Sequence, residues 1–232
     1  ADLESLEKRL PNLEKRAKSG GDKEAALTVT LIHAALAELN AGKPARLAFE
    51  KGKIAKEDTK AWEMLQLLTS KPALYVCNVE EGAADKGNAL SEAVAVRAKA
   101  NSVVISAQIE SEIALLDADE RQEFLETLGL EEPGLNRLIR EAYKLLGLAS
   151  YFTVGPKEAR AWTIHVGDTA PQAAGVIHTD FEKGFIRAET MAYDDFVKFN
   201  GEAGCKEHGK FRQEGKEYLV KDGDILNFRF NV

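Results

Sequence analysis

The chain has 232 residues, of which 44% are hydrophobic and 30% are charged, and its formal net charge is −7. No run of 18 apolar residues occurs, so no membrane-spanning helix is expected. The acidic excess lies in residues 53–148, which carry 11 basic and 17 acidic side chains. Because no strongly basic stripe exists, sequence readout of DNA is not expected, and any contact with RNA must be local.

The cysteines favour a reduced, cytoplasmic protein. Cys77 and Cys205 lie far apart, match no metal-ligand spacing, and Cys77 falls inside an apolar segment. The sequence opens with Ala1 inside a helical pattern rather than with Met. We therefore expect an N-terminal part to precede it.

Residues 1–52 are predicted to form a coiled-coil helical hairpin. Apolar residues recur at alternating spacings of three and four, which is the rhythm of a coiled-coil seam: Leu3, Leu6, Leu10, Leu13 and Ala17, then Ala25, Val29, Ile32, Leu36 and Leu39. The segment Ser19–Asp22 breaks the pattern, and Asp22 suits the N-cap of the second helix. Pro11 is expected to kink the first helix or remove a hydrogen bond.

Basic residues gather near the tip of this hairpin: Lys15, Arg16, Lys18 and Lys23. They form either a contact site for RNA or another partner, or a solvated charged end.

Residues 53–148 alternate between helix and strand. Helices are predicted around Glu57–Leu68 and Ala89–Ala100, each followed by an apolar strand, at Ala73–Cys77 and Ser102–Ala107. Further helices run to Leu146, and Gly147 is the expected C-cap of the last of them. Apolar strands separated by helices indicate a parallel sheet covered on both faces, and two strands are too few for a whole domain. We expect half of an α/β domain, with an exposed sheet edge and apolar face.

Residues 149–232 read as a small α+β domain of short strands and tight turns. Helices are expected over Pro171–Ile177 and Tyr193–Phe199, and the glycine-rich segment Gly201–Lys210 reads as a connector. The predicted strands lie within residues 151–155, 159–167, 184–191, 217–224 and 224–232.

Polar residues follow both predicted parallel strands where the strands end. Asn78 and Glu81 follow the first strand, and Ser106 and Ala107 end the second. Ligands bind outside the carboxyl ends of such strands, and a carboxamide can pair with the N7 and N6 of adenine. The alternative is that Asn78 is only a turn residue. The pairing of the two strand ends favours a purine-base pocket.

The segments Asn78–Glu81 (NVEE) and Ser106–Glu112 (SAQIESE) resemble nucleotide motifs of the YchF-type Obg-like ATPases. Residues Arg160–Glu189 and the ending DGDILNFRFNV are similar to the TGS domain of that family, a β-grasp module. The resemblance extends over the whole chain. It implies three domains: a coiled-coil hairpin (1–52), the C-terminal half of a nucleotide-binding domain (53–148) and a TGS domain (149–232).

The resemblance implies a cytoplasmic P-loop protein that hydrolyses ATP, prefers ATP to GTP, and associates with ribosomes, the large subunit being the expected partner. Base-reading roles would fall on Asn78, the backbone of Val79, Glu81, Ser106 and Ala107. The hairpin and the TGS domain would contact the ribosome or RNA.

One departure from the family is plain. The motif G-x-x-x-x-G-K-[ST] occurs nowhere in the 232 residues, and neither does a switch segment that would hold Mg²⁺. Mg²⁺ and catalysis are therefore expected only with the N-terminal part, and this chain alone should be inactive. The alternative is a non-catalytic module that binds RNA or the ribosome.

Overall fold

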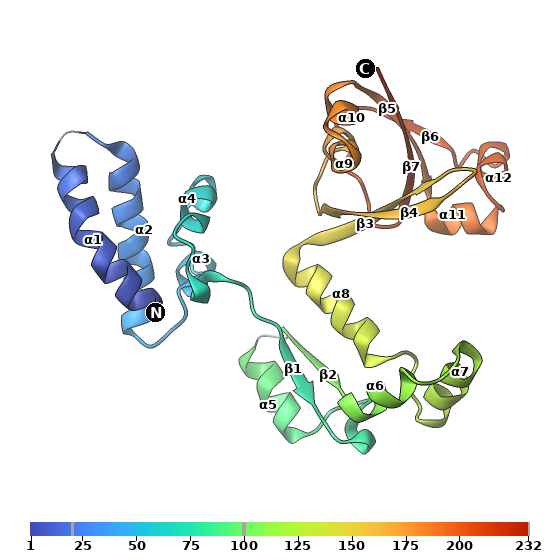
Figure 1. Ribbon diagram of the computed structural model, residues 1–232, viewed down its shortest axis with the longest axis horizontal. Helices are drawn as coiled ribbons and strands as arrows, with labels where there is room; N and C mark the ends of the chain where they lie inside the picture. Colours follow the sequence, from blue (N-terminus) through green and yellow to red (C-terminus); the bar gives the residue numbers. More distant parts are fainter. Residues whose placement is uncertain (20, 99–100, 232) are drawn as a thin grey trace. The chain divides into compact units, whose positions relative to one another are not determined.

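A computed structural model describes residues 1–19, 21–98 and 101–231 as a mixed α/β protein (Figure 1). The chain separates into two compact units, Ala1–Ala73 and Leu74–Val232. The described residues form a two-stranded parallel sheet and a five-stranded mixed sheet, both in the second unit. None of the described helices is long and apolar enough to cross a membrane.

The first unit is built on two long helices, α1 (Asp2–Lys18) and α2 (Lys23–Asn40), which lie side by side. They occupy the two ranges predicted to be helical. The predicted break over 19–22 includes residue 20, which lies outside the described residues. Asp22 does cap α2, because its Oδ1 accepts a hydrogen bond of 2.9 Å from the amide of Ala25. Helix α1 continues across Pro11.

Residues after position 52 complete the core of this unit, which therefore reaches Ala73. The predicted helix over 57–68 was wrong as a continuous element. The chain instead forms short segments: α3 (Arg46–Glu50), η1 (Lys56–Asp58), α4 (Thr59–Glu63) and η2 (Leu68–Ser70). Gln66, at φ 54°, lies in the left-handed region and stops any helix there. Trp62 and Leu65 are buried in one apolar cluster with Leu6 of α1 and Ile32 of α2.

A buried carboxylate ties η2 to the start of α1. Asp2 accepts hydrogen bonds from the amides of Leu68 (2.9 Å) and Thr69 (2.7 Å) and from the Thr69 hydroxyl (2.7 Å). Burial alone would raise the pKa of Asp2, but these hydrogen bonds outweigh that effect and lower it. The charged form of Asp2 therefore stabilises the fold of this unit.

Acid should destabilise the first unit through Glu38. Its side chain is only 4% exposed, and Lys51 and Lys53 each donate to it at 2.7 Å. These hydrogen bonds lower the pKa of Glu38 from its ordinary value of 4.5 to about 2. Because the folded pKa is depressed, the stabilisation is present above pH 4.5 and is lost as the pH falls through about 2. Urea unfolding followed at α2 should show Glu38→Gln less stable than wild type at pH 6, with the gap closing towards pH 2. A gap independent of pH would contradict this account.

The second unit begins with the parallel pair β1 (Tyr75–Asn78) and β2 (Ser102–Ile105), with Asn78 opposite Ile105. The predicted parallel sheet is confirmed. Around it lie η3 (Glu81–Ala83), α5 (Ala89–Arg97), α6 (Ala107–Ile113), α7 (Ala118–Thr127) and α8 (Gly134–Leu146). The predicted end of the α5 helix, residues 99–100, lies outside the described residues. Gly147 closes α8 at φ 63°, the left-handed C-cap that the sequence predicts.

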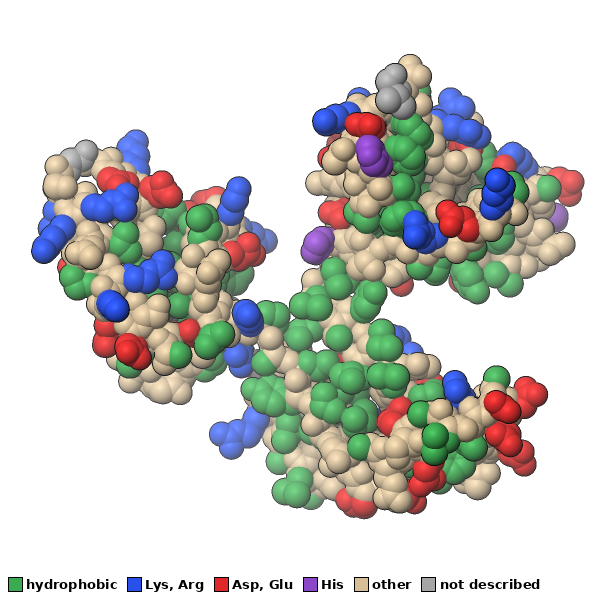
Figure 2. All heavy atoms as spheres, in the orientation of Figure 1, with side chains coloured by type: hydrophobic (Ala, Val, Ile, Leu, Met, Phe, Trp, Pro, Cys, Tyr) green, Lys and Arg blue, Asp and Glu red, His purple; other side chains and the backbone are tan. Residues whose placement is uncertain are grey.

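The two-stranded sheet keeps an exposed apolar surface. Tyr75 and Val76 of β1 are 44% and 46% exposed, and Leu90 and Val96 of α5 are largely exposed. Figure 2 shows apolar side chains gathered over the part of the molecule that contains β1, β2 and α5. An apolar sheet surface of this kind is what half of a larger sheet is expected to leave uncovered.

Residues 148–231 form a five-stranded sheet in the order β4-β3-β7-β5-β6, in which only β3 and β7 run parallel. The strands are β3 (Leu148–Val154), β4 (Ala159–His165), β5 (Phe185–Ala192), β6 (Arg212–Glu214) and β7 (Asp224–Phe230). Helices α9 (Ala170–Ile177), α10 (Thr179–Lys183), α11 (Tyr193–Lys198) and α12 (Glu202–Glu207) accompany them.

Apolar side chains pack on both faces of this sheet. Leu226 and Phe228 of β7 lie in one cluster with Ala173 of α9, and Ile225 lies in a second cluster with Cys205 of α12. Three sequence predictions were wrong here. Residues 217–223 form no strand beyond an isolated bridge at Leu219, and β7 begins only at Asp224. Strand β6 was missed, and the predicted connector over 201–210 contains α12.

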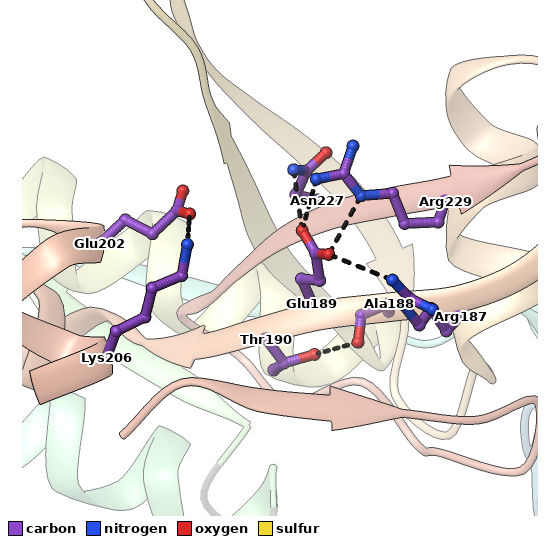
Figure 3. Close-up of polar contacts among 8 residues, drawn as sticks. All are labelled: Arg187, Ala188, Glu189, Thr190, Glu202, Lys206, Asn227 and Arg229. Carbon is purple, nitrogen blue, oxygen red and sulfur yellow. Dashed lines mark hydrogen bonds and ion pairs between the residues drawn. The ribbon is translucent and has the colours of Figure 1, made fainter. Parts of the chain in front are cut away.

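A polar cluster pins β5 to β7 (Figure 3). Glu189 is buried and accepts hydrogen bonds from Arg229 through both of its oxygens, each at 3.0 Å, and from Asn227 at 3.1 Å. Arg187 lies 3.8 Å from the same carboxylate. The bidentate pair satisfies the buried charge and fixes the register of the two strands.

Candidate nucleotide-base site

The candidate site lies where the two parallel strands end. Asn78 is the last residue of β1 and pairs in register with Ile105, the last residue of β2. Both strands therefore deliver their following loops to one edge of the sheet. We call residues 78–84 the Asn78 loop and residues 105–107 the Ser106 loop. This edge is where open α/β sheets bind their ligands.

A hydrogen bond joins the two loops. The amide of Ala107 donates to Oδ1 of Asn78 at 2.9 Å. Of the two polar atoms of a carboxamide, only the oxygen can accept from an amide N–H, so this bond fixes the orientation of the Asn78 side chain. Asn78 is exposed, and its Nδ2 remains as a donor that faces away from Ala107.

Val79 contributes a backbone acceptor. Its amide already donates to the carbonyl of Ile105 at 2.9 Å, which extends the pairing of β1 and β2 by one residue. Its carbonyl oxygen is therefore the backbone group that Val79 can offer to a ligand. The predicted backbone role of Val79 stays a prediction, narrowed to an acceptor.

Ser106 is a buried hydroxyl without a partner. It is 2% exposed, and its Oγ makes no hydrogen bond within the described part of the chain. The residue is the N-cap of α6, yet its side chain does not cap that helix. The hydroxyl of Ser106 is therefore a buried polar group in the Ser106 loop that no described residue satisfies.

Glu81 stands apart from this cluster. It begins η3 and is exposed, and its carboxylate makes no hydrogen bond or ion pair with any described residue. The structure thus brings together Asn78, Val79, Ser106 and Ala107. Glu81 remains on the Asn78 loop, and its side chain has no partner among the described residues.

A supporting layer behind the loops was not predicted from the sequence. Glu110 of α6 accepts hydrogen bonds from the amides of Gly134 (2.7 Å) and Leu135 (3.2 Å), the first two residues of α8. Arg137 of α8 donates to the carbonyl of Ala84 at 3.2 Å, at the end of the Asn78 loop. The sequence did contain one indication of this layer. Pro133, the N-cap of α8, has no side chain that can accept a hydrogen bond, so the first amides of that helix need an acceptor from elsewhere.

The site offers a donor and an acceptor side by side. Nδ2 of Asn78 can donate, and the carbonyl of Val79 can accept, in adjacent residues of one loop. Adenine presents the complementary pair along one edge, with N7 accepting and the N6 amine donating. The protein therefore belongs to the class of mixed α/β proteins with a candidate ligand site at the carboxyl ends of parallel strands.

Comparisons with known proteins agree with this class. The family model YchF-GTPase_C, described as a protein of unknown function (DUF933), matches residues 148–231. The Ribosome-binding ATPase YchF of Haemophilus influenzae is 52% identical over 235 residues, covering 100% of this chain and 63% of the relative. The protein of the same name from Bacillus subtilis is 48% identical and covered to the same extent.

A solved structure has the same fold. The Schizosaccharomyces pombe YchF GTPase superposes with a TM-score of 0.81 at 32% identity, covering 98% of this chain and 62% of that one. The chain belongs to the YchF family. It spans 63% of the length of the curated relatives named above.

Proposed function

We propose that the natural protein containing this chain is a ribosome-associated ATP-binding and ATP-hydrolysing protein, and that this chain supplies its base-reading loops. The observation that carries the proposal is the Asn78–Ala107 hydrogen bond at the ends of β1 and β2. The names of the relatives, ribosome-binding ATPases, support the assignment.

The hydrogen-bonding pattern supports adenine over guanine. With N7 paired to Nδ2 of Asn78, a guanine O6 would lie against the carbonyl of Val79, acceptor against acceptor, and the amide of Ala107 is already engaged by Oδ1 of Asn78. An adenine N6 amine needs an acceptor, and the carbonyl of Val79 can serve. An unpaired polar group costs about 1–3 kcal/mol, which corresponds to roughly tenfold to hundredfold discrimination of ATP from GTP. In this proposal Ser106 lines the base, and Glu81 accepts from a base or ribose donor.

Of the predicted range 53–148, residues 74–148 are proposed to be the C-terminal half of a nucleotide-binding domain, because residues 53–73 pack in the first unit. The exposed surface of Tyr75 and Val76 supports this, since further strands would cover it. Phosphate and Mg²⁺ binding would belong to the N-terminal part. The described residues of this chain place no three His, Cys, Asp or Glu side chains together for a metal.

Partner binding is proposed for the two outer parts. Residues 1–52 would be a coiled-coil hairpin and residues 149–232 a TGS β-grasp domain, and both would contact the large ribosomal subunit or its RNA in the cytoplasm. The mixed sheet crossed by α9 supports the β-grasp assignment.

A second candidate is a non-catalytic module that binds RNA or the ribosome. The exposed lysines at the tip of the first unit favour it: Lys15, Lys18 and Lys23. The two candidates differ in nucleotide dependence. A module of this kind would hold ribosomes equally well with and without ATP.

The base site is tested by Asn78→Ala in the whole natural protein. We expect ATP binding, measured by calorimetry, to weaken by about 1–3 kcal/mol without loss of folding, because the N7 donor and the link to Ala107 are both removed. Asn101→Ala is the matched control, since Asn101 is an exposed carboxamide beside the opposite end of β2. Equal ATP affinity in the two variants would reject the role of Asn78.

A further inference from the structure

The start of α8 is attached to Glu110 of α6, the helix that follows the Ser106 loop, and to Ala84 at the end of the Asn78 loop. Its first two amides, of Gly134 and Leu135, donate to the carboxylate of Glu110. Glu110 lies one turn into α6, the helix that begins at Ala107. Since the N-cap Pro133 offers no side-chain hydrogen bond, Glu110 supplies the cap from another element, where its negative charge also suits the helix dipole.

The second attachment reaches the other loop. Arg137, three residues further along α8, donates to the carbonyl of Ala84. Ala84 follows η3 and ends the Asn78 loop. Gly134 itself packs tightly here, because a Cβ at that position would lie 2.8 Å from Oε1 of Glu110 and 3.0 Å from Cγ2 of Ile105. The end of β2 and the start of α8 are therefore in close van der Waals contact.

The far end of α8 leads straight into the five-stranded sheet. Gly147 ends the helix and β3 starts at Leu148. The hydroxyl of Tyr143 lies 3.3 Å from that of Thr163 on β4. Helix α8 therefore connects Ala84 and the start of α6 at one end to residues 148–231 at the other. A displacement of Ala107 or Ala84 can reach the five-stranded sheet through this helix.

We propose that Glu110 and Arg137 are positioning residues that couple occupation of the base site to the placement of α8, and so to the five-stranded sheet. The inference rests on the proposed function and adds its regulation. When a bound base tightens the Asn78 loop against Ala107, we expect the movement to reach α8 through Arg137, which holds Ala84, and through Glu110 of α6. By reciprocity, a partner that holds the sheet changes the affinity for the base.

The test compares ATP with inorganic tripolyphosphate, which has the phosphates of ATP and no base, in the whole natural protein. Glu110→Ala should weaken ATP binding about fivefold and leave tripolyphosphate binding unchanged. Glu110→Gln keeps one neutral acceptor oxygen and should fall between wild type and Glu110→Ala. Glu112→Ala, an exposed acid on the same helix, is the matched control and should bind ATP as wild type does.

Hydrogen exchange gives a second readout that a purely structural role would not move. ATP should slow exchange of the Gly134 and Leu135 amides in wild type and in Glu112→Ala, whereas tripolyphosphate should not. In Glu110→Ala the ATP-dependent slowing should disappear.

The outcomes separate the two proposals. If Asn78→Ala binds ATP and tripolyphosphate in the wild-type ratio, the base site and this inference both fail. If Asn78→Ala weakens ATP binding selectively while Glu110→Ala behaves like Glu112→Ala, the base site stands and the coupling is overturned. Equal losses for ATP and tripolyphosphate in Glu110→Ala would also overturn it, since that pattern reports general damage.

Discussion

Trp62→Ala is expected to destabilise the first unit by about 3–5 kcal/mol, the usual cost of emptying a fully packed aromatic site. Trp62 is 5% exposed and belongs to the cluster that also holds Leu6 and Ile32. The loss should appear at α1 and α2, although Trp62 lies in α4. Hydrogen exchange of the buried α2 amides, such as that of Ile32, measures the effect without interference from the second unit.

Met64→Ala is the control for this variant. Met64 follows α4 directly and is 68% exposed, so its truncation should change the stability by less than about 0.5 kcal/mol. If Trp62→Ala left exchange in α2 unchanged, the helical pair would be independent of residues 53–73. The domain boundary at 52 would then describe the molecule better than the one at Ala73.

Prediction from the sequence succeeds best where the structure depends on residues that are close together in the chain. The Asp22 N-cap and the Gly147 C-cap were both predicted, and each depends on neighbours within four residues. The break at Gln66 was not predicted, because nothing in that residue favours the left-handed region. Burial of Trp62 against α1 and α2 stabilises a bend that the local pattern does not encode.

In the candidate site too, one contact could be predicted from the sequence and another could not. Asn78 and Ala107 were predicted to meet because parallel strands in register end at the same edge, and the structure joins them at 2.9 Å. The contact from Glu110 to Gly134 spans 24 residues and depends on how α6, α7 and α8 fold back. No periodicity reports such a contact, so the layer behind the loops is visible only in the structure.

The second large effect on stability is expected at α12, which lies in the segment that was predicted to be a connector. Gly201–Lys210 has two glycines near its start, which favours a loop by composition alone. In the fold, Asn200 and Gly201 take φ of 56° and 106° and turn the chain sharply, so that α12 folds back on the end of α11. Cys205 is thereby buried beside Met191 and Ile225.

Gly204→Ala should therefore destabilise residues 148–231 by about 3 kcal/mol, at the upper end of overpacking costs. A Cβ on Gly204 would lie 1.8 Å from the carbonyl oxygen of Phe199 and 2.8 Å from its carbon, and both are backbone atoms that cannot rotate away. Relief of this clash requires α12 to move outward, which pulls Cys205 out of its apolar cluster.

Denaturant unfolding followed by thiol accessibility of Cys205 measures both the loss of stability and the exposure of Cys205. Gly215→Ala, where a Cβ meets nothing within 4 Å, is the matched control. Equal stability of the two variants would show that α12 is loosely attached, and the apolar cluster around Cys205 would then contribute little to the fold.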